Sequence, residues 1–230
     1  MTARTTSAGP TTILYDDTLL SHADEAPFTP PAGTAAIGGR GAAWNVPARD
    51  GDGEWVLRHY RRGGLPAKFS ADVYLWPGLT LTRPWREWHL LAELHALGLP
   101  VPRPVAARVV RSGFGYRGDL ITRRIPAARS LAELLARGGA PPWRDTGACI
   151  RRFHAAGVWH ADLNAHNILV DRDGAVWLLD FDRGERRRPA AGWQQANLER
   201  LARSLRKLKV PEAALESGWA ALLEGYGPPG

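Results

Sequence analysis

The spacing of apolar positions changes along this chain, from runs of strand length in the first half to helical periodicity in the second. Up to residue 125, short apolar runs between Gly- and Pro-rich turns predict strands over residues 11–15, 54–60, 105–110 and 119–125. The exception is residues 83–97, where leucines at helical spacing predict an amphipathic helix: Leu90, Leu91, Leu94 and Leu97. Beyond residue 125, periodicity predicts helices over residues 130–137, 143–155, 191–208 and 211–226. Together these elements predict an α+β fold, and residues 1–10 are expected to be disordered.

Between residues 160 and 182, two short apolar runs flank an Asp-Gly turn, which is the pattern of a β-hairpin. Asn167 precedes the first run and Asp180 closes the second. Because a hairpin brings its outer ends together, these two side chains should lie side by side, with Asp162 one short loop away. An Asn and an Asp can hold Mg²⁺ through their oxygens, and a second Asp can accept the proton of an attacking hydroxyl. The alternative is a polar hairpin mouth that arises by chance in an ordinary α/β domain.

The hairpin also carries a resemblance to known proteins. The spacing His160-x-Asp162-x-x-x-x-Asn167, followed by Asp180-Phe181, resembles the catalytic and metal-binding loops of the protein-kinase-like fold. The fuller spelling of the segment is similar to the 3-deoxy-D-manno-octulosonic acid (Kdo) kinases of lipopolysaccharide core assembly. That resemblance implies ATP and Mg²⁺ as cofactors, Asp162 as the catalytic base, Asn167 and Asp180 as metal ligands, and His160 as a brace within the loop.

The resemblance further implies a bilobal fold with a small β-rich N-lobe and a mostly helical C-lobe. We expect an N-terminal extension over residues 1–33, the N-lobe over 34–125 and the C-lobe over 126–230. A glycine cluster precedes the strand of residues 54–60, and there Gly39 and Gly41 are candidates for binding nucleotide phosphates. An ordinary turn is the alternative reading of such a cluster.

Arg58 occupies the position where the kinase-like fold carries a phosphate-binding lysine. Arginine keeps the charge and can bind phosphate through two donors, although a solvent-facing strand arginine would look the same in the sequence. Glu87 lies at the edge of the apolar face of the helix of residues 83–97, and a carboxylate there needs a partner or must reach solvent. The resemblance supplies the partner, since it implies an ion pair between Glu87 and Arg58.

Composition narrows the choice of partners. The 230 residues are 44% hydrophobic and 23% charged with a formal net charge of +7, which favours an anionic partner, although a codon bias toward arginine would explain part of the excess. Cys149 is the single cysteine, so an internal disulfide is excluded. We see neither a secretory signal nor an apolar run of transmembrane length. The candidates for contact with the acceptor or a membrane are basic residues near the predicted site: Arg61, Arg62, Lys68, Arg183, Arg186, Arg187 and Arg188.

The helix of residues 191–208 adds a basic face of Arg200, Arg203, Arg206 and Lys207, which we expect either to be solvated or to rest on anionic lipid. The short segment after Asp180 leaves little room for a peptide groove and favours a small-molecule or glycolipid acceptor. By resemblance, the expected reaction is ATP-dependent phosphorylation of the Kdo 4-hydroxyl on a lipid A precursor, at the cytoplasmic side of the inner membrane. No nucleic acid and no obligate protein partner are expected. Alternatives are another sugar, small-molecule or protein kinase of the same fold, or a non-catalytic pseudokinase that binds lipid.

Overall fold

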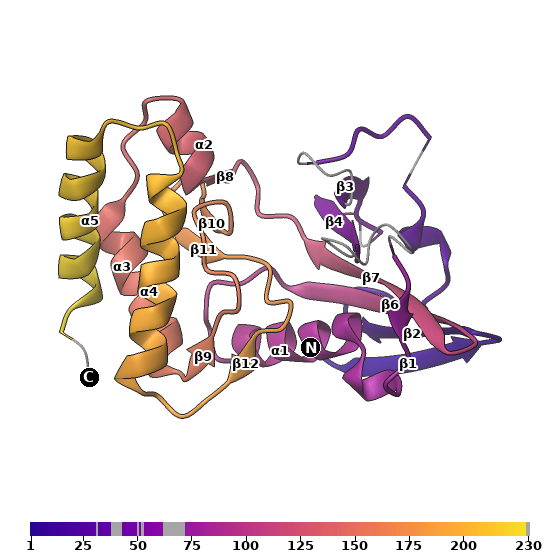
Figure 1. The fold of residues 1–230 in the computed structure, drawn as a ribbon. Helices are drawn as coiled ribbons and strands as arrows, with labels where there is room; N and C mark the ends of the chain where they lie inside the picture. Colours follow the sequence, from indigo (N-terminus) through magenta and orange to yellow (C-terminus); the bar gives the residue numbers. More distant parts are fainter. Residues whose placement is uncertain (31, 38–42, 50, 52, 62–71, 229–230) are drawn as a thin grey trace. The chain divides into compact units, whose positions relative to one another are not determined.

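The computed structural model describes the chain except residues 31, 38–42, 50, 52, 62–71 and 229–230 (Figure 1). Within the described ranges the protein is a mixed α/β chain with antiparallel sheets and five α-helices. Its internal contacts fall into two compact units. The first unit comprises Met1–Glu93 and Arg103–Arg124, and the second comprises Leu94–Pro102 and Ile125–Gly230.

The first unit is built on one antiparallel sheet with the strand order β1-β2-β6-β7-β4-β3, and β5 pairs with β7 beside this path. Its strands are β1 (Ala3–Ala8), β2 (Thr11–Asp16), β3 (Ala43–Pro47), β4 (Glu54–His59), β5 (Tyr74–Leu75), β6 (Pro104–Ser112) and β7 (Gly115–Arg123). Among the described residues, two 3-10 turns, Ala26–Phe28 and Leu79–Leu81, and most of helix α1 (Arg83–Ala96) complete the unit.

Alternation along β4 explains how this sheet buries one face. Trp55 and Leu57 are fully buried. Arg58 follows Leu57 directly, so its side chain is directed to the other face of the sheet and stays partly accessible. The core around them is formed by residues of β2, the segment that follows it, β3, β6 and β7: Ile13, Tyr15, Leu19, Leu20, Phe28, Val46, Val105, Ala106 and Ile121. Each large side chain buried there contributes roughly 1.5–3 kcal/mol, so β4 is a firm base for the polar residues on its other face.

Three details of the first half differ from the sequence-based expectation. The expected disorder of residues 1–10 is wrong, because Ala3–Ala8 forms β1, which pairs with β2 along its whole length. The strand expected at residue 119 begins earlier, at Gly115, and the short strand β5 was not expected. Helix α1 ends at Ala96, and Leu97 is 53% exposed rather than part of the buried face that Leu90, Leu91 and Leu94 form.

The second unit is mostly helical. Its helices are α2 (Leu131–Ala136), α3 (Trp143–Ala155), α4 (Ala191–Arg206) and α5 (Glu212–Tyr226). Short strands complete it: β8 (Arg129–Ser130), β9 (Val158–Trp159), β10 (Ile168–Val170), β11 (Val176–Leu178) and β12 (Glu185–Arg186). The expected capping box is confirmed at the start of α2, where the Ser130 side chain accepts from the Glu133 backbone and the Glu133 carboxylate accepts from the Ser130 backbone. None of the helices in the described ranges has the length and apolar composition needed to cross a bilayer.

Helices α3 and α5 pack closely through glycines (Figure 1). A Cβ atom at Gly147 on α3 would collide with the backbone carbonyl oxygen of Leu222, and one at Gly225 on α5 would collide with that of Arg144. At Gly218 the added atom would meet the Trp143 ring. Backbone atoms cannot swing away as a side chain can, so these glycines set the distance between the two helices.

We expect Gly147→Ala to lower the free energy of unfolding by about 2 kcal/mol, because the added methyl group pushes α5 away from α3. Urea denaturation followed by far-ultraviolet circular dichroism measures the change. The matched control is Gly192→Ala on α4, where an added Cβ meets nothing within 4 Å. That control should be neutral or stabilising by up to about 1 kcal/mol. Equal effects of the two substitutions would contradict the close packing.

Candidate active site

The hairpin predicted from the sequence is present. Strands β10 and β11 pair antiparallel with Ile168 opposite Leu178, and β10 also pairs with β8. The pairing extends past the strand ends, where the Leu179 backbone N–H donates to the Asn167 carbonyl over 2.9 Å. Asn167 and Asp180, which follows Leu179 directly, therefore leave the same end of the hairpin. The predicted convergence of these two residues rests on this backbone register.

His160 ties the loop of Asp162 to the end of β11. Its Nδ1 accepts the Asp162 backbone N–H over 3.1 Å, and its Nε2 donates to the Leu179 carbonyl over 2.8 Å. A backbone N–H can only donate and a carbonyl can only accept, so both bonds together require the neutral imidazole protonated at Nε2. Complete burial lowers the pKa of His160 and favours this neutral form. His160 thus braces the loop from within, as the resemblance implied.

Helix α4 forms the wall against which this loop rests. The buried Asn197 amide accepts from the His160 backbone N–H over 3.2 Å and donates to the His160 carbonyl over 3.0 Å. One turn and two turns further along α4, Arg200 and Ser204 contact Asp162 and the Ala165 backbone N–H, respectively. These three helix residues are spaced as neighbours on one helix face. The loop is therefore held at its beginning, middle and end by one rigid element.

Asp162 is bound by Arg200 through its side chain. The Arg200 Nε and a terminal nitrogen lie 3.0 and 2.8 Å from the same carboxylate oxygen, Oδ1. In the part of the chain that the structure describes, the other oxygen, Oδ2, has no hydrogen-bond donor. Both side chains are about half exposed, so solvent screens the pair and its contribution to stability is small. Its consequence is orientation, because one oxygen is fixed and the other can receive a proton from a bound hydroxyl.

The backbone around Asp162 is fixed by two asparagines. Asn164 and Asn167 each donate a side-chain N–H to the Asp162 carbonyl, over 3.0 and 2.9 Å. The Asn164 side-chain oxygen in turn accepts the backbone N–H groups of His166 and Asn167, which closes a tight turn. Since the Asn167 amide nitrogen is used in this way, its side-chain oxygen points elsewhere and is the atom able to bind a cation.

Asp180 has a left-handed backbone, with φ of +60°, which Asp adopts more readily than most residues but less readily than glycine. Phe181 after it is fully buried, 5.7 Å from the Phe153 ring and 4.8 Å from the His160 ring. This anchor holds the sharp turn in place and keeps the Asp180 carboxylate out of the core. A left-handed residue next to a buried aromatic anchor is a local strain of the kind found at functional sites.

The side-chain oxygens of Asn167 and Asp180 fit Mg²⁺, which takes oxygen ligands and usually keeps waters and substrate phosphates in its shell. Among the described residues, no group of three or more His, Cys, Asp and Glu side chains could hold a metal ion. A cation held by Asn167 and Asp180 would therefore share its coordination with water or with phosphate oxygens. Such an incomplete protein shell suits a metal that arrives with a nucleotide.

In the first unit, the expected pair between Glu87 and Arg58 is confirmed. Glu87 on α1 is 3% exposed, and its Oε2 accepts from both the Arg58 guanidinium and the Tyr60 hydroxyl. The Tyr60 hydroxyl also accepts from Arg58 over 3.2 Å, and the Arg58 guanidinium carbon lies 4.8 Å from the Tyr60 ring centroid. Removing one member of such a buried pair leaves an uncompensated charge, which is strongly unfavourable. The cluster therefore fixes a partly accessible guanidinium on a rigid strand.

Several other predicted residues have different surroundings. Gly39, Gly41, Arg62 and Lys68 lie outside the described residues, and Arg61 is exposed just after β4. Arg183 is exposed with a left-handed backbone. Arg187 lies 3.8 Å from the Trp159 ring centroid and bonds Glu185 over 2.5 Å, while Arg186 belongs to β12 and Arg188 is exposed. The basic run after the hairpin is thus partly committed to contacts within the protein.

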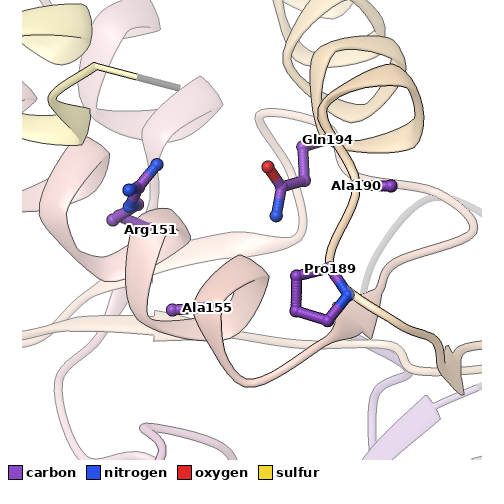
Figure 2. A pocket seen from close by; sticks show the side chains of 5 residues that line it. All are labelled: Arg151, Ala155, Pro189, Ala190 and Gln194. Atoms are coloured by element: carbon purple, nitrogen blue, oxygen red, sulfur yellow. The ribbon is translucent and has the colours of Figure 1, made fainter. Parts of the chain in front are cut away.

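A small pocket of about 180 Å³ lies in the second unit, lined by Arg151, Ala155, Pro189, Ala190 and Gln194 (Figure 2). Its polar side chains are already engaged. Gln194 donates to the His154 carbonyl over 3.3 Å, and the Arg151 guanidinium lies over the Tyr226 ring and bonds the Pro228 carbonyl. None of the predicted catalytic or metal-binding residues lines it, so the pocket is separate from the candidate site.

The site thus combines Asp162, held by buried His160 and by the Arg200 guanidinium, with an Asn and an Asp at the end of a hairpin. This combination is typical of enzymes that transfer phosphoryl groups. The family model described as "Lipopolysaccharide kinase (Kdo/WaaP) family" matches residues 35–226. This chain belongs to that family.

Named relatives agree with the family match. A protein of Stenotrophomonas maltophilia (strain K279a) named 3-deoxy-D-manno-octulosonic acid kinase is 49% identical over 222 residues, covering 93% of this chain and 88% of the relative. A protein of the same name from Xanthomonas campestris pv. campestris (strain B100) is 50% identical over 203 residues, covering 86% and 81%. A third, from Xanthomonas axonopodis pv. citri (strain 306), is also 50% identical over 203 residues. The similarity therefore spans both units.

Proposed function

We propose that this chain transfers the γ-phosphoryl group of ATP to a hydroxyl of Kdo carried on a lipid A precursor, in lipopolysaccharide biosynthesis. Family membership and relatives named 3-deoxy-D-manno-octulosonic acid kinase, at about 50% identity over most of the chain, support the substrate. The observation that carries the chemistry is Asp162, held by His160 through its backbone and by Arg200 through one oxygen. The resemblance of the catalytic loop points to the 4-hydroxyl as the acceptor.

In this proposal Asp162 aligns the acceptor hydroxyl and takes its proton. Phosphoryl transfer needs positioning and charge neutralisation more than covalent chemistry from the protein. Arg200 fixes Oδ1, so Oδ2 is the oxygen that meets the hydroxyl. The asparagines that bind the Asp162 carbonyl and the His160 ring that accepts its N–H fix the backbone of Asp162, and Arg200 limits the rotation of its carboxylate.

Arg58 binds nucleotide phosphate in place of the lysine of the kinase-like fold, and buried Glu87 and Tyr60 hold its side chain ready. Asn167 and Asp180 hold Mg²⁺, which neutralises phosphate charge when it is bound. Gly39 and Gly41 remain predicted phosphate contacts. The sheet-based first unit and the helical second unit correspond in content to the N-lobe and C-lobe of a bilobal kinase.

We place the protein at the cytoplasmic face of the inner membrane as a peripheral protein, because the proposed acceptor is a lipid there. The excess of arginine and lysine over acidic residues supports contact with anionic lipid and with the acidic sugar. Arg61, Arg62, Lys68, Arg183, Arg186 and Arg188 remain candidates for the acceptor or the membrane.

The experiment that tests the function uses pure protein with ATP, Mg²⁺ and a panel of acceptors: a Kdo-bearing lipid A precursor, the same lipid without Kdo, a heptose-bearing core fragment and a generic protein substrate. Mass spectrometry of the products should show one added phosphoryl group on the first acceptor alone. Tandem fragmentation then locates the modified hydroxyl. Phosphorylation of the lipid that lacks Kdo, or of the protein, would contradict the proposal.

Arg200 should behave as a positioning residue for the base. We expect Arg200→Ala to lower kcat about tenfold while leaving the KM for ATP nearly unchanged, because Asp162 loses its alignment but the nucleotide contacts remain. Arg200→Lys, which keeps the charge without the two-donor contact, should fall in between. Steady-state kinetics at saturating acceptor measure both constants.

The matched control is Arg203→Ala on the same helix, where the side chain is exposed and lies 3.9 Å from Glu199. Its kcat should equal that of the unmodified protein. If Arg203→Ala slowed the reaction as much as Arg200→Ala, the effect would belong to the charge of α4 in general and not to the bond with Asp162.

A further inference from the structure

The turn between β6 and β7 carries the most exposed large apolar side chains among the described residues. Ser112 pairs with Gly115, so Gly113 and Phe114 form the turn, and Phe114 is 92% exposed. Beside it runs β5, where Leu75 is 78% exposed. We call Leu75, Trp76 and residues 111–115 the hairpin tip; it belongs to the β6–β7 hairpin and not to the β10–β11 hairpin of the candidate site. Two large apolar side chains that lie close together and are both open to water form an apolar patch, and such patches mark sites of contact with a protein or a membrane.

The hairpin tip is an ordered structure. The Trp76 backbone N–H donates to the Phe114 carbonyl over 2.9 Å, and Leu75 is the register partner of Gly115. The Trp76 ring packs edge-on against Tyr116 at 6.1 Å. Phe114 is therefore held out by a fixed backbone, although folding would favour burying it. Ordered display of an apolar side chain has a cost in water, and the cost is recovered only if the side chain meets an apolar phase.

The surroundings of the hairpin tip are basic and amphipathic. The Arg111 guanidinium carbon lies 5.0 Å from the Trp76 ring centroid, and its Nε donates to the Gly113 carbonyl. The neighbouring turn of β1 and β2 lies alongside, since the Arg111 backbone N–H donates to the Pro10 carbonyl over 2.9 Å. Residues 1–15 and 103–118 contain no Asp or Glu and five arginines, of which Arg4, Arg108, Arg111 and Arg117 lie on the strands.

Other acidic groups near the tip are already paired with arginines. Asp72 bonds Arg117 over 2.7 Å, and Asp119 bonds Arg108 over 2.9 Å. These ion pairs use the charges of Arg108 and Arg117, so the positive charge that remains beside the tip is that of Arg111. A Trp with a guanidinium at its face suits the headgroup level of a bilayer, and Phe and Leu suit the acyl boundary below it.

We infer that the hairpin tip is the part of this protein that enters the membrane, with Phe114 and Leu75 in the acyl boundary and Arg111 among anionic phospholipid headgroups. The choice of lipid rests on the proposed function, which requires a lipid-borne acceptor. The size of the surface supports the same choice, because two apolar side chains at a turn fall short of the roughly 800 Å² per partner that stable protein interfaces bury. The membrane contact expected at Arg186–Arg188 is then secondary.

The first test is co-sedimentation with vesicles that contain phosphatidylglycerol, compared with vesicles of phosphatidylcholine alone. We expect the double variant Leu75→Ser/Phe114→Ser to lose about tenfold or more in its partition coefficient on anionic vesicles. Both side chains are exposed, so the melting temperature should not fall. Leu97→Ser, an exposed apolar position in the second unit, is the matched control and should bind as the unmodified protein does.

Salt separates apolar insertion from pure charge attraction. At about 1 M salt the Debye length shrinks to about 3 Å, so attraction between arginines and headgroups fades. The unmodified protein should keep a fraction of its binding under these conditions, whereas the double variant should lose all of it. Charge reversal at Arg186, Arg187 and Arg188 should weaken low-salt binding by less than the double variant does.

A label reports insertion directly. Cys149 is the single cysteine, and burial raises its pKa to about 12, so it should not react with maleimide. A polarity-sensitive dye on Ser112→Cys, next to the turn, should shift its emission to the blue on anionic vesicles and be quenched by lipids that carry a nitroxide on the acyl chain. The same dye on Ser217→Cys, an exposed position on α5, should do neither.

Activity assays keep this inference distinct from the proposed function. The double variant should phosphorylate a detergent-dispersed acceptor at the normal rate and lose activity only on acceptor embedded in vesicles. The inference is overturned if the unmodified protein does not bind anionic vesicles, if the double variant binds them equally well, or if the Ser112→Cys dye stays in water. Failure of phosphorylation in detergent by the unmodified protein would instead count against the proposed function.

Discussion

Asp162→Asn should lower kcat about a thousandfold while ATP binding changes by no more than a few-fold. The substitution keeps the shape of the side chain and removes the oxygen able to accept the hydroxyl proton, and general base catalysis typically contributes a factor of about 10²–10⁴. The backbone contacts of Asp162 to His160, Asn164 and Asn167 do not involve its side chain, so the loop should survive. Single-turnover kinetics with Kdo-bearing acceptor, together with calorimetry of ATP binding, separate the two effects.

The matched control for this substitution is Asp173→Asn in the turn of the same hairpin. Asp173 is exposed, and its carboxylate lies 3.7 Å from Arg172. The control removes one carboxylate from the same hairpin and should leave kcat unchanged. Near-native turnover of Asp162→Asn would remove Asp162 from the mechanism and leave another group as the base.

Asp180→Asn should raise the Mg²⁺ concentration needed for half-maximal activity about a hundredfold and lower kcat as well. The variant exchanges a charged ligand for a neutral one, and Mg²⁺ depends strongly on carboxylate charge. Asn is chosen over Ala because the left-handed backbone at Asp180 favours Asp and Asn, so the fold should not be strained further. Titration of activity with Mg²⁺ at a fixed ATP concentration measures the shift.

Asp182→Asn is the companion variant, because it removes a carboxylate two residues along the same loop. It should leave the Mg²⁺ dependence close to that of the unmodified protein. An unchanged Mg²⁺ dependence in Asp180→Asn would place the metal elsewhere, and equal shifts in both variants would indicate a general effect of negative charge.

The sequence predicted the parts of the site whose members are close together in the chain. The hairpin follows from two apolar runs and an Asp-Gly turn, and its register places Asn167 and Asp180 at one end. Pairing of Arg58 with Glu87 came from family resemblance, since the sequence itself showed only a carboxylate beside an apolar helical face. The structure adds Tyr60 as a third member of that cluster.

The contacts made by α4 were missed because they are not local. Helical periodicity puts Arg200 on a solvated or lipid-facing basic face, yet its guanidinium binds Asp162. Asn197 and Ser204 belong to no motif of the sequence, although polar residues at positions 197, 200 and 204 repeat at helical spacing beside the leucine stripe. That repeat was the available signal. Helical periodicity shows that the three residues share one face of α4, but it does not show which segment packs against that face in the tertiary structure.

Strand β1 was missed for a different reason. Its residues are Ala, Arg, Thr and Ser, and all are exposed, so neither apolar alternation nor β-branched enrichment on a buried face distinguishes them. The strand exists because β2 beside it offers a full ladder of hydrogen-bond partners. Edge strands of this kind are specified by their neighbour, and the neighbour's outer edge cannot be read from the edge segment alone.

The dependence of the catalytic loop on α4 also sets the order in which the site can form during synthesis. A nascent chain that has emerged from the ribosome as far as Asp182 already contains Asp162, Asn167 and Asp180. It still lacks the side chains of α4 that hold the loop, which are those of Asn197, Arg200 and Ser204. Domains fold from the N-terminus as they emerge, so the first unit can be complete while the loop still waits for the helix behind it. The residues that carry the chemistry are therefore synthesised before α4. They reach their final arrangement only once α4 has been synthesised and has packed against the loop.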